Sequence, residues 1–237
     1  MRKPLFLFAM LLFGLTGWTQ KTIVHDPNAQ VRQIKGYHGI EVSDAIDLYL
    51  SHGDEETVVV SARDIRWRDR IRTEVEDGIL RISLPDHGLS LGNLKLKAYV
   101  SFTTLDRLTA SGASDVFVDG VIAGDELSIS LSGASDFKGA VRVRKLRMEQ
   151  SGASDAHLTG AVSGLVSIHS TGASNIKGYD LVTESCDVHA SGAADIHITV
   201  NKELSADLSG ASNVYYKGNG VIRETHSSGA SNIKKVS

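Results

Sequence analysis

Ser111-Gly112-Ala113-Ser114-Asp115 is the stretch that decides the fold, because it recurs almost unchanged through the second half of the chain. Further copies occupy residues 132–136, 151–155, 171–175, 191–195, 209–213 and 228–232. Successive copies begin 21, 19, 20, 20, 18 and 19 residues apart. One short motif of small residues in each period of about 20 residues is typical of a solenoid, in which every repeat is a rung that buries its apolar side against its neighbours.

Apolar residues recur at fixed distances from each motif copy. Three positions before the first motif residue stand Leu108, Ile129, Met148, Ile168, Val188, Ala206 and Thr225. Five positions before it, in the second to sixth copies, stand Leu127, Leu146, Val166, Cys186 and Leu204. Directly after the Asp or Asn stand Val116, Phe137, Ala156, Ile176, Ile196, Val214 and Ile233. Apolar residues two apart point to the same side of an extended chain, so we predict a strand before and a strand after each motif, with the motif as the bend between them.

The repeat length predicts the shape of a rung. An extended chain of 20 residues measures about 66 Å, which suits a coil of three short strands and three turns. Successive coils would pair in parallel, and parallel crossovers are right-handed. We therefore predict an all-β protein: a right-handed parallel β-helix, or single-stranded solenoid, with about seven regular rungs over residues 108–237 and an irregular β region over residues 34–107.

The first 33 residues are expected to lie outside this domain. Arg2 and Lys3 precede an apolar run over residues 5–15, which is typical of a signal peptide over residues 1–20. The run is too short to cross a bilayer core of about 30 Å, so we expect no transmembrane segment after cleavage, an uncleaved anchor being the alternative. Residues 21–33 are interpreted as a flexible lead-in or a first edge strand. The protein is thus expected in the periplasm, on the outer cell surface or secreted.

The irregular region carries several local signals. Ser43-Asp44-Ala45-Ile46-Asp47 echoes the motif and is interpreted as a degenerate copy. Asp77-Gly78 between alternating apolar residues predicts a hairpin. Residues 84–93 predict a loop. The charged stretch 63–70 predicts one helical turn or an excursion from the coil, with Trp67 either covering the apolar end of the coil or stacking on carbohydrate.

Composition limits the choice of partners. The formal net charge of −3, with both signs interspersed, does not favour a nucleic-acid partner. Cys186 is the sole cysteine and occupies an apolar column, so we predict a small buried hydrophobe without a disulfide.

The sharpest polar feature is a column of Asp and Asn residues that closes each motif copy. It comprises Asp115, Asp136, Asp155, Asn175, Asp195, Asn213 and Asn232. Clustered carboxylate oxygens are ligands that Ca²⁺ prefers. However, Asp and Asn at a bend also bond local backbone amides, and the interchange of Asp with neutral Asn favours this structural interpretation.

A second polar column lies two positions before each motif. In it, His169 and His189 are expected to be neighbours, and imidazoles about 5 Å apart are able to share a zinc ion. No third histidine follows on the next rung, so we predict ordinary outward polar side chains, or a surface-binding role for His169 and His189, rather than a metal site. We predict no catalytic residue, no metal and no cofactor.

Taken together, these features resemble a known family. They are the opening Gly36-Tyr37-His38-Gly39-Ile40-Glu41-Val42, the strand Asp47-Leu48-Tyr49-Leu50, the hairpin over residues 71–82 and the serial Ser-Gly-Ala-Ser-Asp/Asn copies. Over about residues 34–237 the chain is similar to the "putative auto-transporter adhesin head GIN domain" family of Bacteroidota, formerly a domain of unknown function. The resemblance implies a right-handed β-helix in a secreted or envelope protein, with no catalytic residues to transfer.

We therefore expect a non-enzymatic adhesin or binding module that presents a flat repetitive face to a glycan or another envelope component. Two alternatives stay open: a carbohydrate-active enzyme of the polysaccharide lyase or hydrolase kind, and a purely structural or regulatory envelope protein. In solution we expect a monomer or weak end-to-end self-association.

Overall fold

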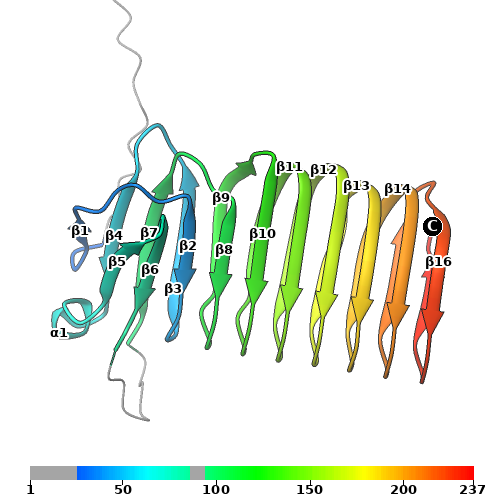
Figure 1. The fold of residues 1–237 in the computed structure, drawn as a ribbon. Coiled ribbons are helices and arrows are strands. Elements are labelled where there is room, and N and C mark those ends of the chain that lie inside the picture. The colour runs from blue at the N-terminus through cyan, green and yellow to red at the C-terminus, as the bar shows by residue number, and fades with distance from the viewer. Residues whose placement is uncertain (1–25, 86–93) are drawn as a thin grey trace, which may run out of the picture.

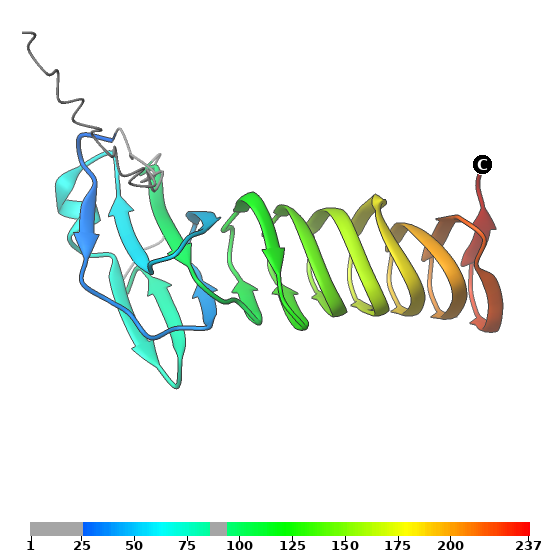
Figure 2. The same cartoon turned by 90° about the horizontal axis from the view of Figure 1, so that it is seen from above.

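The computed structural model describes residues 26–85 and 94–237, in which seventeen strands form one continuous sheet (Figures 1 and 2). Strands make up 64% and helix 2% of the structure, and the sheet winds into a parallel β-solenoid of about six turns. The all-β solenoid predicted from the motif period is therefore confirmed. The seven motif copies correspond to about six turns because a turn is the chain between two successive bends.

Regular rungs run along the second half of the chain. Their strands are β8 (Arg107–Ala110), β9 (Val116–Ala123), β10 (Glu126–Leu131), β11 (Phe137–Gln150), β12 (Asp155–Ser170), β13 (Asn175–Ala190), β14 (Asp195–Leu208), β15 (Asn213–Lys217), β16 (Val221–Ser227) and β17 (Asn232–Lys235). Neighbouring rungs pair in parallel and in register, so that Ile129 lies opposite both Leu108 and Met148. Separate turns were expected at the corners away from the motif. In β11 to β14 the chain instead passes these corners as one long strand with register shifts, because its parallel pairing with the neighbouring rungs continues around the coil.

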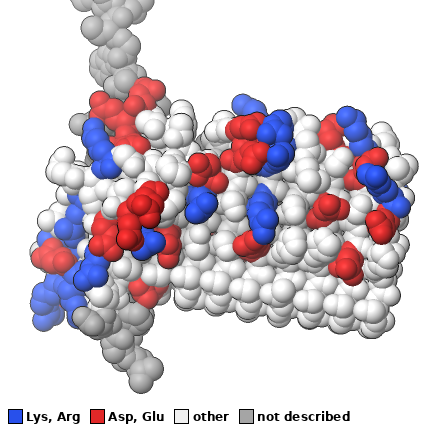
Figure 3. Space-filling model, viewed as in Figure 1, with Lys and Arg blue, Asp and Glu red and all other residues white. Residues whose placement is uncertain are grey.

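The motif forms the bend of every rung. Its glycines all have positive φ, from +73° at Gly210 to +91° at Gly172. The following alanine donates its backbone N–H to the glycine carbonyl of the preceding rung, as Ala134 does to Gly112 at 2.8 Å. The bends expose only small uncharged residues, and Figure 3 shows an uncharged band along this edge of the solenoid.

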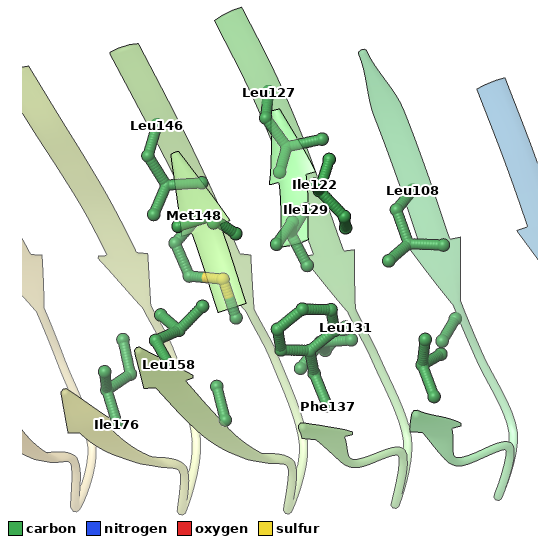
Figure 4. Close-up of a cluster of buried hydrophobic side chains, with 14 of the residues drawn as sticks. Leu108, Ile122, Leu127, Ile129, Leu131, Phe137, Leu146, Met148, Leu158 and Ile176 are labelled. Carbon is green, nitrogen blue, oxygen red and sulfur yellow. The ribbon is translucent and has the colours of Figure 1, made fainter. Parts of the chain in front are cut away.

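The predicted apolar columns form the core. Leu108, Ile129 and Met148 are fully buried and form one row across neighbouring rungs, with Leu127 and Leu146 in the next row (Figure 4). The rows thin out at the last rung, where Thr225 is exposed and Ile233 is only partly buried. Cys186 is buried as predicted, and burial raises the pKa of its thiol.

The irregular region closes one end of the solenoid (Figures 1 and 2). It contains β1 (Gln30–Arg32), β2 (Gly39–Val42), β3 (Ile46–His52), β4 (Thr57–Ser61), α1 (Ile65–Arg68), β5 (Arg72–Glu76), β6 (Ile79–Ser83) and β7 (Leu96–Phe102). β2 and β3 pair in parallel with β8 and β9 of the first regular rung, and also with β6 and β7 beyond. The outermost pairs β1–β4, β4–β7 and β5–β6 are antiparallel.

Several local predictions for this region are confirmed. Asp77 and Gly78, both at positive φ, turn the hairpin of β5 and β6. The stretch 63–70 contains the single helical turn α1. Asp44 takes the left-handed conformation that glycine takes in the regular copies, and it lies beside Gly112, so residues 43–47 are indeed a copy of the bend. Residues 21–33 were interpreted as either a flexible lead-in or a first edge strand. In the described part of this segment, residues 30–32 form the edge strand β1.

The expected signal peptide and most of the loop over residues 84–93 lie outside the described residues. Residues 26–85 and 94–237 contain no helical segment with the length and hydrophobicity of a transmembrane span.

Candidate functional site

The solenoid presents two long faces separated by the row of bends. We call the face that precedes the bends the pre-bend face; it comprises β6, β2, β8, β10, the second halves of β11 to β14, and β16. The post-bend face comprises β7, β3, β9, the first halves of β11 to β14, β15 and β17. Because alternate side chains of a strand point outward, each face carries straight outward columns.

The Asp/Asn column lies at the start of the post-bend face, directly after the bends. Asp155, Asn175, Asp195, Asn213 and Asn232 are in register. The Asn175 side-chain amide donates to Asp155 Oδ1 at 2.8 Å, and Asn213 donates to Asp195 in the same way at 2.8 Å. Each of these two contacts connects one rung to the next along the axis.

The carboxylates at the other end of the column bond to backbone instead. Asp115 Oδ1 accepts the backbone N–H of Asp136 at 3.3 Å, and Asp136 Oδ1 accepts that of Asp155 at 3.1 Å. Asp47, from the degenerate bend, extends the column beside Asp115. Burial, and secondarily the charge of Asp115, raises the pKa of Asp47, and burial raises the pKa of Asp115.

This arrangement does not converge on a metal ion. In the part of the chain that the structure describes, no three His, Cys, Asp or Glu side chains are grouped so as to hold a metal. Instead, a carboxylate oxygen of Asp115, Asp136, Asp155 or Asp195 accepts a hydrogen bond from the residue at the same position of the next rung, so these contacts form a ladder of hydrogen bonds.

The second polar column lies on the pre-bend face, as its spacing predicted. Glu149, His169, His189, Asp207 and His226 are in register. The rings of His169 and His189 stack with centroids 4.8 Å apart, and His189 Nδ1 lies 4.0 Å from Asp207 Oδ2. The pair is exposed, and a carboxylate rather than a third imidazole follows it.

Trp67 does not share a surface with the two histidines. It belongs to α1 at the closed end of the solenoid, is partly buried against the core, and lies under the guanidinium of Arg70 at 4.7 Å. The structure thus brings His169 and His189 together and separates them from Trp67, the third residue that the sequence had suggested for surface binding.

A third column was missed in the sequence. It runs along the post-bend face, two positions after the Asp/Asn column, and we call it the aromatic–lysine column. Its in-register members are Tyr99, Tyr49, Phe117, Lys138, His157, Lys177, His197, Tyr215 and Lys234. From Phe117 onward, aligning the repeats on their motif reveals these equivalent positions. The residue type changes from copy to copy, however, so no repeated residue draws attention to the column in the sequence.

Two groups of neighbouring rings lie toward the ends of this column, and the second group includes Tyr179, which is not itself a column member. Tyr49 stacks between Tyr99 and Phe117, with centroid distances of 5.0 and 5.2 Å. At the other end His197 lies between Tyr179 and Tyr215, both at 5.0 Å. Burial lowers the pKa of His197; the charge of Asp195 opposes this shift and that of Lys177 adds to it.

A lysine lies over one ring of each group. Lys97 Nζ is 5.8 Å from the ring centroid of Tyr49, and Lys217 Nζ is 4.9 Å from that of Tyr179. Between the two groups, a shallow hollow is lined by Phe117, Lys138, His157 and the small residues Gly139 and Ala140. The post-bend face thus combines rings, lysines and a depression on one side of the solenoid.

Comparison with known proteins finds solved structures with the same fold and a matching family. Among curated proteins no relative matches. Several solved structures share the fold at low sequence identity. A putative adhesin from Bacteroides fragilis NCTC 9343 is 21% identical and matches with a TM-score of 0.79, over 88% of this chain and 96% of that one. A putative adhesin from Parabacteroides distasonis ATCC 8503 is 22% identical and matches with a TM-score of 0.70, over 88% of this chain and 96% of that one. A structure named putative lipid binding protein, also from Parabacteroides distasonis ATCC 8503, matches at 21% identity with a TM-score of 0.64 over 90% and 98%.

The family comparison is decisive because it covers most of the chain. The family model described as "Putative auto-transporter adhesin, head GIN domain" matches residues 36–220, from the opening of β2 to the last regular rungs. The chain belongs to this head GIN domain family.

Proposed function

We propose that this protein is an exported, non-enzymatic binding module that attaches to a glycan or another component of the cell envelope through a long face of its solenoid. The observation that carries the proposal is the set of straight, in-register outward columns. Parallel rungs repeat every ~4.8 Å, so each column offers one outward side chain per rung along one line. A repetitive surface of this kind suits a repetitive ligand, and the adhesin-like family is consistent with it.

The enzymatic alternative, a polysaccharide lyase or hydrolase, finds less support in the geometry. Glycoside hydrolysis needs an acid and a base or nucleophile that face one scissile bond. Here the ladder oxygens of Asp115, Asp136, Asp155 and Asp195 accept hydrogen bonds from the next rung. Occupied acceptors of this kind stabilise a bend and are poorly placed to attack or protonate a substrate.

The proposal is tested by binding and turnover measured on the same material. Fluorescently labelled mature protein is incubated with whole bacterial cells, with epithelial cells and on a glycan array, and the same preparation is assayed for release of reducing ends from polysaccharides. We expect saturable binding that unlabelled protein displaces, without depolymerisation. Turnover would favour the enzyme, whereas absence of binding to cells and array alike would favour the structural or regulatory alternative.

A further inference from the structure

We propose that the aromatic–lysine column binds a linear acidic polysaccharide that lies along the solenoid axis. The inference rests on the proposed function and names the chemical class of its ligand. Three features carry it: the donor character of the column, the unpaired state of its lysines, and the hollow beside Phe117.

The column offers hydrogen-bond donors to solvent and contains no acidic residue. Its polar members are tyrosines, histidines and lysines, of which lysine is a donor only. The rings stack along the axis, so their faces cover one another and their edges are left for a ligand. The outward column of the pre-bend face, in contrast, includes Glu41, Glu149 and Asp207. An anionic ligand is therefore matched to the aromatic–lysine column rather than to the outward column of the pre-bend face.

The lysines of the column are free to bind an anion. Within the described residues, Lys138, Lys177 and Lys234 form no ion pair. Five cations elsewhere in the repeats are paired: Arg144 with Asp125, Lys145 with Glu126, Arg147 with Glu149, Lys202 with Glu184 and Arg223 with Glu203. A paired cation must give up its carboxylate partner to bind an anionic ligand, whereas an unpaired cation has no partner to lose. Binding an anion to the column lysines therefore costs less free energy than binding it to the paired cations.

The hollow supplies a place for a sugar ring. Phe117 is 37% exposed and covers Tyr49 with one face only. The hollow beyond it has Gly139 and Ala140 in its lining, with Lys138 and His157 beside them. The C–H face of a pyranose carries partial positive charge, which the π face of an aromatic ring attracts. A uronate or sulfated sugar in this hollow would thus meet a ring and an ammonium together.

The neighbouring Asp/Asn column weakens this attraction only in part. Three of its seven members, Asn175, Asn213 and Asn232, are neutral, and the carboxylates of Asp155 and Asp195 each accept an amide hydrogen bond. The balance is most favourable at the C-terminal rungs, where Lys177 is in register with His197, Lys234 is in register with Tyr215, and Lys217 lies over the ring of Tyr179.

A polymer exploits this arrangement better than a single sugar. The column offers one side chain per rung along a straight line, and a linear acidic polysaccharide repeats its charged groups along a chain. Once one group is bound, the next binds at a high effective concentration, so weak individual contacts add to a measurable affinity.

The test compares two double variants with the same change in net charge. Lys138→Gln/Lys177→Gln removes two unpaired lysines of the column. Lys145→Gln/Lys202→Gln removes two ion-paired lysines outside it. Binding of mature protein to polygalacturonate, alginate and chondroitin sulfate is measured by affinity electrophoresis and biolayer interferometry, with dextran and duplex DNA as controls. Equal melting temperatures establish that both variants are folded.

We expect the wild type to bind at least one acidic polysaccharide and neither dextran nor DNA. The column variant should lose about tenfold in affinity, and the matched control less than about twofold. The inference is overturned if no acidic polysaccharide binds, if DNA binds equally, or if the two variants lose equal affinity. If the column variant still binds whole cells like the wild type, the ligand assignment fails while the proposed function stands; if the wild type binds neither cells nor polysaccharide, both fail.

Discussion

The backbone N–H of Ala153 donates a hydrogen bond of 2.8 Å to the carbonyl oxygen of Gly133, one rung earlier in the bend. The same contact recurs between Ala173 and Gly152 at 2.8 Å. These bonds bring successive glycines so close that a methyl group has no room between them. Each glycine is thus required both for its positive φ and for this close approach.

Replacing Gly152 by alanine should therefore destabilise the protein strongly. Its φ of +80° costs an L-residue about 1–2 kcal/mol, and the new Cβ would also collide with the Gly133 carbonyl oxygen. Gly124→Ala is the matched control, because a Cβ there meets no atom within 4 Å. Urea unfolding should show a large loss for the first and little change for the second; similar midpoints would refute the stacking argument.

Calcium should leave the melting temperature unchanged. A cation that bound the Asp/Asn column at 100 times its Kd would stabilise the fold by about 2.7 kcal/mol, which a thermal scan resolves readily. Asp155→Asn should be nearly neutral, because an amide oxygen is able to accept the Asn175 hydrogen bond. Asp155→Ala removes that acceptor and should cost about 0.5–1.5 kcal/mol. A calcium-dependent rise that Asp155→Asn abolishes would instead establish a calcium site.

The carboxyls of Asp47 and Asp115 should make stability fall as the pH rises. Their pKa values in the folded state lie above the ordinary 3.8, so the folded protein holds these protons more tightly than the unfolded chain. The advantage is complete below pH 3.8 and is lost as the pH passes through the raised pKa. Asp47→Asn/Asp115→Asn should thus melt higher than the wild type at neutral pH, and the gap should close in acid. A gap that is independent of pH would contradict this origin.

Removing one whole rung should be tolerated. Deletion of residues 151–170 joins Gln150 to Thr171 and brings Gly172 onto Gly133 in place of Gly152, with every column still in register. Because solenoid stability is roughly a sum of rung and interface terms, the variant should unfold cooperatively with a modest loss. Deletion of residues 151–160 alone shifts the columns and should cost far more. Equal midpoints for the two deletions would contradict independent rungs.

The strands at the far end from α1 should resist self-association because of their lysines. Among the described residues, β16 and β17 pair with a strand on one side only, and Val221 is 63% exposed. Lys235 Nζ lies 5.8 Å from the ring of the nearly buried Tyr216. Lysines on an edge oppose pairing with another chain, so Lys234→Thr/Lys235→Thr should promote end-to-end dimers. Sedimentation velocity compares the variant with the wild type, and a variant that stays monomeric at high concentration would exclude this role.

The sequence alone determined the solenoid, the columns and the bends. In a solenoid with a constant repeat, residues at equivalent positions of successive repeats lie side by side. The pairing of Ile129 with Met148 and of His169 with His189 is therefore predictable from the sequence. The bend was equally predictable, because every motif contains a glycine, which is able to take the positive φ of a bend, and a constant repeat places each glycine beside the glycine of the next motif.

The tertiary structure decided what lies outside this constant period. β3 pairs with both β7 and β9, so Tyr49 is placed between Tyr99 and Phe117, an order that no period in the sequence encodes. Likewise the register shift between β13 and β14 brings Tyr179 onto His197. Non-local pairing and bulges are settled by the packing of the whole coil, and for this reason the aromatic groups of the proposed binding face emerge only in three dimensions.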